Sequence, residues 1–476
     1  MGKGNDDRSW LVRAVPALIV GLALVAMAAG MLVASRAGVT RHPSKQVSFG
    51  FFDVLIVYAT PTAELVVAGL LTTVSFVILV VGLDAWAADR VTNPARRASD
   101  ASGRPLRDEV TDTPTVGSIA VIALIPARNE ALHLPATLAS LRRQTTPPAA
   151  IWVIADNCTD DTAEVADALG ANVFTTIDNR HRKAGGLNQL LSQLLPTLGP
   201  TDAVLVMDAD TVMVDHFLER AVHELEGDAR HDAVGGVFYG DDTPGLLALM
   251  QRNEYMRYSR DISRRKGRVF VLTGTASVFR ADALSTVGGA RGTILPGEVG
   301  NVYDTFSLTE DNELTIALKT LGARLVSPRG CRVRTELMPT WRDLWHQRQR
   351  WQRGALENIG MYGWSSATAR YWAQQFGLGY GLVALGSFLA FTVLSYIAAG
   401  FLVVVVFWVL LGVLFAVERT ATVWEGGWRA RLLAVTLLPE LGYAIVLQLV
   451  YVKSLVDIAL GRSKQWNPAT VTRVQS

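Results

Sequence analysis

Cysteine is almost absent from this chain, because only Cys158 and Cys331 occur in 476 residues. So few thiols exclude a disulfide-based scaffold and a cysteine-rich zinc site. The seven histidines are scattered without the spacing of metal ligands. The chain also lacks a large excess of positive or negative charge. Its formal net charge is +2, which gives no electrostatic basis for binding nucleic acid. No nucleic-acid partner is therefore expected.

Apolar residues, in contrast, make up 50% of the chain, and the mean hydropathy is +0.25. Residues 14–34 and 65–83 are uncharged runs long enough to cross a hydrocarbon core of ~30 Å. Residues 376–417 suit two spans joined near 398–400, and 432–458 give at least one more. The first run is long for a signal peptide and a second follows it, which favours an anchor over a cleaved leader. We therefore expect an integral membrane protein with about 5–6 spans.

Between the apolar regions, short apolar runs alternate with helical patterns, which is typical of an α/β domain. Strands are predicted at 119–125, 151–155, 171–175, 203–207, 233–239 and 269–279, and a helix at 312–321 that ends at Gly322. The predicted order is an N-terminal membrane region (1–90), a polar linker (91–115), the α/β domain (116–338), amphipathic interface helices (339–372), a C-terminal membrane region of about three spans (373–460) and a polar tail (461–476).

Two aspartates, Asp208 and Asp210, end the apolar run 203–207 as a D-x-D pattern. In an open parallel sheet, ligands bind at the carboxyl ends of the strands. Two carboxylates placed there repel each other, and Mg²⁺ relieves such repulsion when it also binds substrate phosphates. An isolated D-x-D is also compatible with a strand that simply ends in a polar turn.

Two earlier strand ends carry polar residues as well. Residues 126–130 form a turn after the first strand, and Asp156 ends the second. Asp156 can accept a hydrogen bond from a pyrimidine N–H, or it can be a solvated strand end. Thr159 is expected to cap the next helix, with Asp160 and Asp161 complementing the helix dipole.

Lys183 opens a helical run together with Gly185 and Gly186. Glycines let a backbone approach a ligand, and helix N-terminal amides beside a lysine suit a phosphate. The Walker spacing is absent, and a solvated lysine at a helix start is the alternative.

The acidic triplet Thr309, Glu310 and Asp311 precedes an amphipathic helix. It fits an acidic helix cap, but a carboxylate in a cleft can also take a proton from an attacking hydroxyl.

A last pattern, Q-x-x-R-W, lies in a helix predicted at 341–359, where Gln347, Arg350 and Trp351 are neighbours at i, i+3 and i+4. One side of this helix is apolar: Trp341, Leu344, Trp345, Trp351, Ala355 and Ile359. The helix can therefore lie at a membrane interface and still offer one face to an active site.

In this order and between apolar regions, the five motifs resemble those of the inverting family 2 glycosyltransferases, in their membrane-embedded branch. That branch includes cellulose, hyaluronan, chitin and poly-N-acetylglucosamine synthases and some lipid glucosyltransferases. The resemblance covers about residues 118–354 by motif. It implies a GT-A (Rossmann-like) α/β domain inserted between transmembrane helices.

The resemblance also implies a role for each motif residue. Residues expected at the nucleotide sugar are Pro126, Arg128, Asn129, Glu130, Asp156, Lys183, Asp208 and Arg350. Asp208 and Asp210 are expected to hold Mg²⁺ or Mn²⁺, with Asp210 the more direct ligand. Thr309, Glu310 and Asp311 would form the catalytic T-E-D motif, with Asp311 as general base. Acceptor contacts are expected from Gly274, Thr275, Gln347 and Trp351, although Thr273 stands where relatives often have cysteine.

The function so implied is metal-dependent, inverting transfer from a UDP-sugar, either to a growing glycan that the protein passes across the bilayer or, alternatively, to a membrane lipid. An inactive scaffold is disfavoured because Asp208, Asp210 and Asp311 are all present. A transporter is disfavoured because the polar motifs lie outside the apolar runs. UDP-sugars are cytosolic, so the domain is expected on the cytoplasmic side of a bacterial plasma membrane. The tail resembles a cytosolic one, yet three spans after the domain would place it outside; the sequence leaves this open.

Overall fold

The computed structural model describes residues 7–41, 45–49, 52–56, 59–92, 119–228, 231–265, 267–399 and 406–463. Most of the predicted linker and all but the first residues of the predicted tail lie outside these ranges. The chain forms two compact units, one of Met1–Ala98, Gly379–Ala421 and Ala434–Leu437, the other of Ser99–Leu378, Thr422–Leu433 and Leu438–Ser476. The second unit contains all the predicted site residues.

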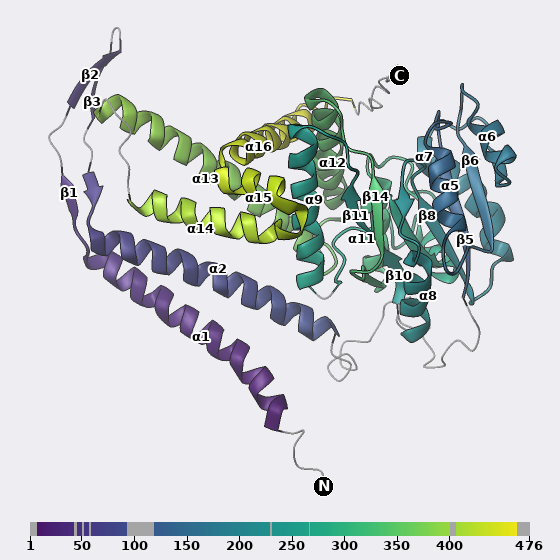
Figure 1. Cartoon of the computed structure of the whole chain (residues 1–476), viewed down its shortest axis with the longest axis horizontal. Coiled ribbons are helices and arrows are strands. Elements are labelled where there is room, and N and C mark those ends of the chain that lie inside the picture. The colour runs from purple at the N-terminus through teal and green to yellow at the C-terminus, as the bar shows by residue number, and fades with distance from the viewer. Residues whose placement is uncertain are drawn as a thin grey trace. The chain divides into compact units, whose positions relative to one another are not determined.

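Four parallel strands form the first half of the main sheet in that unit. They are β5 (Ala120–Ala127), β6 (Ala150–Ala155), β7 (Asn172–Thr175) and β8 (Asp202–Met207), in the spatial order β7-β6-β5-β8. Helices α5 (Leu134–Arg142), α6 (Thr162–Ala168) and α7 (Arg182–Leu194) follow β5, β6 and β7 (Figure 1). Five of the six residues of β8 are buried, as expected for a strand covered on both faces. The four strands predicted from apolar runs are confirmed.

The second half of the sheet is mixed. The strand β12 (Ala276–Arg280) runs antiparallel between β8 and β10 (His231–Gly235), and β13 (Arg324–Val326) is parallel to β10. A separate three-stranded sheet holds β11 (Val237–Gly240), β14 (Arg332–Thr335) and β9 (Val212–Met213). The fold is therefore a GT-A-like α/β arrangement with a mixed sheet.

Two strand predictions in this half are wrong in detail. The run 233–239 is two strands in different sheets, because Gly236 turns away to donate its N–H to Ala276 O at 2.7 Å. In the run 269–279 only the end is a strand. Before it, the N–H of Leu272 donates to Thr315 Oγ1 and that of Gly274 to Asp311 Oδ2, so side chains replace a neighbouring strand as partners.

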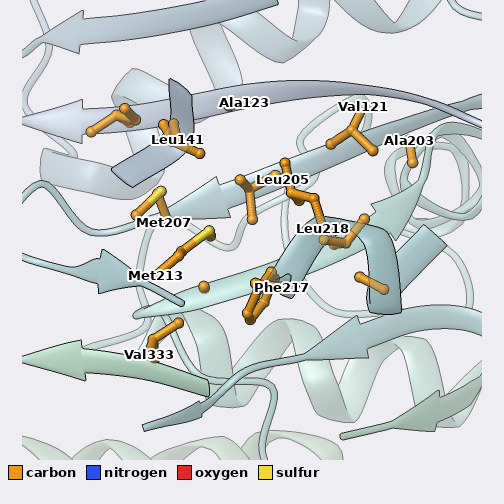
Figure 2. Packing of buried hydrophobic residues seen from close by; sticks show 14 of the residues in the cluster. Val121, Ala123, Leu141, Ala203, Leu205, Met207, Met213, Phe217, Leu218 and Val333 are labelled. Carbon is orange, nitrogen blue, oxygen red and sulfur yellow. The ribbon is translucent and has the colours of Figure 1, made fainter. Parts of the chain in front are cut away.

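Apolar side chains fill both faces of the main sheet. On one face, Leu205 and Met207 of β8 pack with Phe217 and Leu218 of α8 (Phe217–Gly227), as Figure 2 shows. Leu205 and these two α8 residues are fully buried, which contributes about 1.5–3 kcal/mol for each large side chain. The other face packs on α7, α10 (Ala281–Ala290) and α11 (Glu310–Thr320). This packing holds the ends of the strands in fixed positions.

The helix α12 (Trp341–Tyr362) begins at Thr340, whose Oγ1 accepts the Asp343 N–H at 3.2 Å, and it is slightly longer than predicted. It packs against α16 (Leu438–Ala459), where Gln349 Nε2 donates to Asp457 Oδ2 at 2.8 Å. Of its apolar side, Leu344 is buried by protein, whereas Trp341 is 46% exposed. The helix α9 (Leu246–Arg264) lies in the same unit.

The first unit is helical with a short β region. Its helices are α1 (Asp7–Arg36), α2 (Ala63–Thr92), most of α13 (Ala369–Ala399) and α14 (Val406–Thr422). At Gly30, α1 approaches α2 so closely that a Cβ would lie 2.4 Å from Thr72 Oγ1. Between them lie two antiparallel strand pairs, β1 (Val39–Arg41) with β4 (Ala59–Pro61) and β2 (Lys45–Phe49) with β3 (Phe52–Ile56).

Two helices in the described part of the chain are long and apolar enough to cross a membrane, Ala369–Leu394 and Leu438–Ala459. The apolar stretches Leu24–Arg36 and Ala63–Phe76 are shorter. The expectation of five to six spans is therefore not supported, because only two of the described helices combine the length and the hydropathy that a span needs.

Candidate active site

The carboxyl ends of the parallel strands define where a ligand can bind. Strand order reverses between β5 and β8, and in open α/β sheets the crevice at this switch point is the usual ligand site. The residues that follow these strands, 128–130 after β5 and Asp208 and Asp210 after β8, lie at the same sheet edge as Asp156, which follows β6. The predicted strand-end residues are thus brought together.

Lys183, in the first turn of α7, joins two of the acidic motifs. Its Nζ lies 2.5 Å from Asp208 Oδ1 and 3.7 Å from Glu310 Oε1. Burial alone would lower the pKa of Lys183, but the carboxylates of Asp208 and Glu310 raise it above its ordinary value. The ammonium group is therefore charged and holds β8 beside α11 electrostatically.

Asp311 lies on the other side of this contact. Its Oδ2 accepts the Gly274 N–H at 3.1 Å and its Oδ1 accepts the Asn312 N–H at 2.8 Å. A Cβ on Gly274 would lie 2.9 Å from Lys183 Nζ and 3.4 Å from Asp208 Oδ2. The residues that line a small cavity here are Lys183, Val206, Leu272, Thr273, Gly274, Ser277, Phe279, Tyr303, Glu310, Asp311 and Leu314. Asp208 and Asp311, separated by about a hundred residues of sequence, thus face the same glycine.

The environment of Asp311 changes its acidity. Burial, and then the nearby Glu310 carboxylate, raise the pKa of Asp311 to about 6. A carboxylate with such a pKa is ionised at neutral pH and is still a stronger base than an ordinary aspartate. Perturbed carboxylates in a cavity mark candidate catalytic groups.

Asp210 has a different environment, which bears on metal binding. Burial and the negative charges of Asp208, Glu130 and Glu336 raise the pKa of Asp210 to about 7. Its carboxylate accepts a hydrogen bond from Thr211 Oγ1 at 3.2 Å and makes no ion pair with the described residues. Uncompensated negative charge of this kind fits a divalent cation.

The described residues contain no group of three or more histidine, cysteine, aspartate or glutamate side chains arranged to hold a metal on their own. Mg²⁺ needs no such group, since one or two carboxylates together with substrate phosphates suffice. Asp208 and Asp210 therefore fit a metal that arrives with a diphosphate, and Asp210 is the more available of the two because Lys183 occupies Asp208.

Asp156 is buried and held by three donors on one oxygen. Its Oδ1 accepts hydrogen bonds from Asn157 Nδ2 at 3.0 Å, Thr176 Oγ1 at 2.9 Å and Asn179 Nδ2 at 2.7 Å. Its Oδ2 has no donor among the described residues. The side chain is thus fixed with one oxygen left for a ligand.

The turn after β5 is held to the turn after β6. Asn129, at φ 60°, accepts the Thr159 N–H on its Oδ1 at 2.7 Å, and the Glu130 N–H donates to Thr162 Oγ1 at 2.8 Å. Pro126 lies within β5 and Arg128 is exposed. The expectation that Thr159 caps α6 is wrong, because Asp160 Oδ1 instead accepts the Thr162 N–H.

The glycines of the Lys183 motif face protein. A Cβ on Gly185 would lie 2.1 Å from Asn179 Oδ1, and one on Gly186 would lie 3.2 Å from Ile154 Cγ2. They let α7 pack against Asn179, which in turn donates to Asp156. This connection is a feature that the sequence motif did not indicate.

The α12 motif contributes residues with free polar groups. Gln347 Oε1 is buried without a hydrogen-bond partner, and Arg350 makes no ion pair with the described residues. One face of the Trp351 ring is covered by the Arg348 guanidinium, whose centre lies 4.3 Å from the ring centroid. No described contact joins Gln347 or Arg350 directly to Asp208 or Asp210.

The hydroxyl groups of Thr309 and Thr275 both contact other protein side chains. Thr309 is buried, its Oγ1 accepts a hydrogen bond from Asn358 Nδ2 at 3.2 Å, and a Cβ on Gly354 would lie 2.4 Å from that oxygen. Thr275 Oγ1 lies 2.7 Å from Thr273 Oγ1. Thr309 thus packs α11 against α12.

Sequence reasoning missed His133 and Glu336. His133 Nδ1 lies 2.8 Å from Glu130 Oε2, and this hydrogen bond raises the pKa of His133. Burial raises the pKa of Glu336, which lies just beyond β14 and contributes to the negative field at Asp210. Neither belongs to a motif, so no sequence signal indicated them.

Replacing Gly274 with alanine is expected to lower catalytic efficiency about 10-fold or more, because the added methyl group would displace Lys183 Nζ and small misplacements in an active site are costly. The comparison of kcat/KM with that of Gly289→Ala tests this, since a Cβ at Gly289 meets no atom within 4 Å. Equal activity of the two variants would contradict the prediction.

Comparison with known proteins is consistent with these motifs. Residues 119–354 match the family model described as Glycosyltransferase like family 2. The poly-beta-1,6-N-acetyl-D-glucosamine synthase of Staphylococcus aureus (strain COL) is 25% identical over 240 residues, 49% of this chain and 54% of that protein. The synthase of the same name from Staphylococcus epidermidis is 26% identical over 252 residues, 51% of this chain and 56% of that protein. The chain thus spans about half the length of the curated relatives it matches.

Among solved structures, the similarity is at lower sequence identity. A mannosyltransferase from Pyrobaculum calidifontis, solved with GDP-Man and Mn²⁺, is 15% identical, with a TM-score of 0.47 over 81% of this chain and 98% of that one. Residues 1-349 of S. aureus TarS, solved with UDP, are 15% identical, with a TM-score of 0.36 over 74% of this chain and 94% of that one. From the family match and the named synthases, the chain carries a glycosyltransferase domain of family 2 over residues 119–354, the enzyme class expected from its motifs.

Proposed function

We propose that this domain transfers a sugar from a UDP-sugar to an acceptor hydroxyl with inversion of configuration. The observation that supports this best is the meeting of Asp208, Lys183 and Asp311 around Gly274. A donor diphosphate at the D-x-D end of β8 would place its sugar toward Asp311. Acids from separate loops thus serve the leaving group and the attacking group at one site.

Asp311 is the proposed general base. Its carboxylate takes the proton of the acceptor hydroxyl while the hydroxyl oxygen attacks the anomeric carbon. The new C–O bond forms on the face opposite the existing bond between the anomeric carbon and the diphosphate. That bond breaks, and UDP leaves with its electron pair. A donor with an α linkage therefore gives a β-linked product in one displacement.

The leaving group carries growing negative charge, and several residues are proposed to meet it. A bound Mg²⁺ or Mn²⁺ would supply charge neutralisation, held by Asp210 with Asp208. Arg350, which has no ion pair with the described residues, and Lys183 add positive charge. The free Oδ2 of Asp156 accepts the uracil N–H, and residues 126–130 border the nucleoside.

We propose a glycan acceptor, and therefore a polysaccharide synthase, because the named relatives are poly-beta-1,6-N-acetyl-D-glucosamine synthases. Gln347 and Trp351, with Gly274 and Thr275, are the proposed acceptor contacts, and the unpartnered Gln347 Oε1 supports this for Gln347. The two apolar helices would place the enzyme in a membrane, with the domain on the cytoplasmic side where UDP-sugars are made, and the synthase would pass its product across that membrane.

Purified full-length protein incubated with labelled UDP-sugars and Mn²⁺ tests the proposal, with UDP-N-acetylglucosamine and UDP-glucose in the panel. Products are resolved by size and by extraction into organic solvent. A ladder of sugars is the expected result. An organic-phase product would instead indicate a lipid acceptor, and no transfer from any UDP-sugar would contradict the proposed reaction.

A further inference from the structure

A fully buried ion pair lies beside the proposed base. Arg291 and Glu313 are both 0% exposed, and they pair through two bonds, Nη1 to Oε1 at 2.5 Å and Nη2 to Oε2 at 2.8 Å. Removing both charges from water is costly, and only good geometry with further hydrogen bonds compensates for it.

The remaining donors of Arg291 all bind one loop. Its Nη1 donates to Pro296 O at 2.9 Å, its Nη2 to Val302 O at 2.6 Å and its Nε to Asn301 O at 3.3 Å. A guanidinium has five N–H donors, so every donor of Arg291 is used. The loop 292–304, which leads to the T-E-D motif, is thus folded around this side chain.

Glu313 connects the pair to the site. It lies in the first turns of α11, two residues after Asp311, so its position fixes how the start of this helix is rotated. Its Oε1 also accepts a hydrogen bond from Tyr362 OH at 2.5 Å, at the end of α12. The helix with the proposed base and the helix with the Q-x-x-R-W motif are therefore held by one carboxylate.

The same loop is attached to the Lys183 helix. Asn188 Nδ2 donates to Tyr303 O at 2.8 Å, and the Tyr303 N–H donates to Asn188 Oδ1 at 2.9 Å. Asn188 is buried in α7, five residues after Lys183, and Tyr303 lines the cavity with Lys183 and Asp311. A continuous set of contacts joins three motifs through Arg291.

We propose that Arg291 is a positioning residue for sugar transfer: through Glu313 and the loop 292–304 it sets the place of Asp311 relative to Lys183 and Asp208. The inference rests on the proposed function of Asp311 as base. Arg291 itself is fully buried and does not line the cavity. Apolar residues of similar volume can stabilise a fold as well as a buried ion pair, so stability alone does not explain this pair.

Arg291→Lys keeps the charge but loses the two-bond geometry with Glu313. We expect kcat to fall about 10²-fold, with the donor KM changed less than about threefold, because a 1 Å displacement of a catalytic group has an effect of that size. The acid limb of the pH–rate profile should also move, because a displaced Asp311 carboxylate has different neighbours and therefore a different pKa. Tyr362→Phe, which removes one bond to Glu313, should lower kcat about 3- to 10-fold and is the variant most certain to fold.

The double variant Arg291→Met with Glu313→Leu separates position from stability. It should remain folded, as shown by its melting temperature, yet show a kcat reduced as in Arg291→Lys. The matched control is Arg252→Lys, because Arg252 also donates to two loop carbonyls, those of Asp241 and Thr243, in a loop that contains no motif residue. It should keep the kcat of the unmodified protein.

The outcomes are distinguishable. Suppose that the unmodified protein transfers sugar, and that both Tyr362→Phe and a folded Arg291 variant keep its kcat within about twofold and leave its pH profile unchanged. Arg291 then does not position the base, and this inference fails while the proposed function stands. Equal losses of kcat in the Arg252 control would overturn it too. If the unmodified protein transfers no sugar, the proposed function fails and this inference fails with it.

Discussion

Replacing Asp311 with asparagine is expected to lower kcat by about 10²- to 10⁴-fold, the usual contribution of a positioned general base. The amide cannot take the acceptor proton, but it keeps the size of the carboxylate and can still accept the Gly274 N–H. UDP binding should therefore stay nearly unchanged, since Asp311 is not proposed to contact the nucleotide. Turnover and UDP affinity, both measured on the purified full-length protein, test the two parts separately.

The same assignment fixes a pH dependence. Transfer needs the ionised form of Asp311, and burial together with Glu310 raises its pKa from 3.8 to about 6. The value of kcat/KM should fall as the pH drops through about 6, a limb that an ordinary aspartate would show about two units lower. The residual activity of Asp311→Asn should lack this limb.

Asp167→Asn is a suitable control for Asp311→Asn, because Asp167 is exposed on α6 and is no part of the proposed site. It should retain full turnover. An Asp311→Asn enzyme with most of its turnover, or with the acid limb still near pH 6, would show that another group accepts the proton.

The parallel half of the fold could be predicted from sequence because its strands are continuous apolar runs that end in polar residues. Ala203–Met207 followed by Asp208 is the clearest case, and β8 with its sheet edge lies as predicted. The antiparallel strand β12 could not be delimited, because the backbone before it bonds to the side chains of Thr315 and Asp311 from α11. Such partners are distant in sequence and leave no periodic signal.

The sequence motifs indicated which residues lie near one another, but they did not indicate the contacts that hold those residues in place. The sequence indicated that Asp208 and Asp311 share a site, but not that Lys183 lies between Asp208 and Glu310 or that Gly185 admits Asn179. Arg291 and Glu313 gave no signal at all, since isolated charged residues 22 positions apart are usually solvated. The buried pair becomes visible only when the burial of both side chains is known.

Removing the divalent cation, or the carboxylate proposed to hold it, should have the second large effect. EDTA should lower transfer, and added Mg²⁺ or Mn²⁺ should restore it, because the metal offsets charge on the departing diphosphate. Asp210→Asn should lower kcat/KM by about 10²- to 10³-fold, which corresponds to about 3–4 kcal/mol of transition-state stabilisation. Asp202→Asn is the matched control, since Asp202 lies at the opposite end of the same strand and accepts the Gly199 N–H.

Thermal unfolding separates metal binding from catalysis. The negative field of Asp208, Glu130 and Glu336 at Asp210 would be relieved by the proposed cation bound with UDP. At metal and UDP concentrations about 100 times the dissociation constant, the melting temperature should rise by about 5–10 °C. Asp210→Asn should lose most of this rise and Asp202→Asn should keep it. If Asp210→Asn retains both the rise and the response to EDTA, the cation is held elsewhere, and the charge at the end of β8 must then be balanced by Lys183 alone.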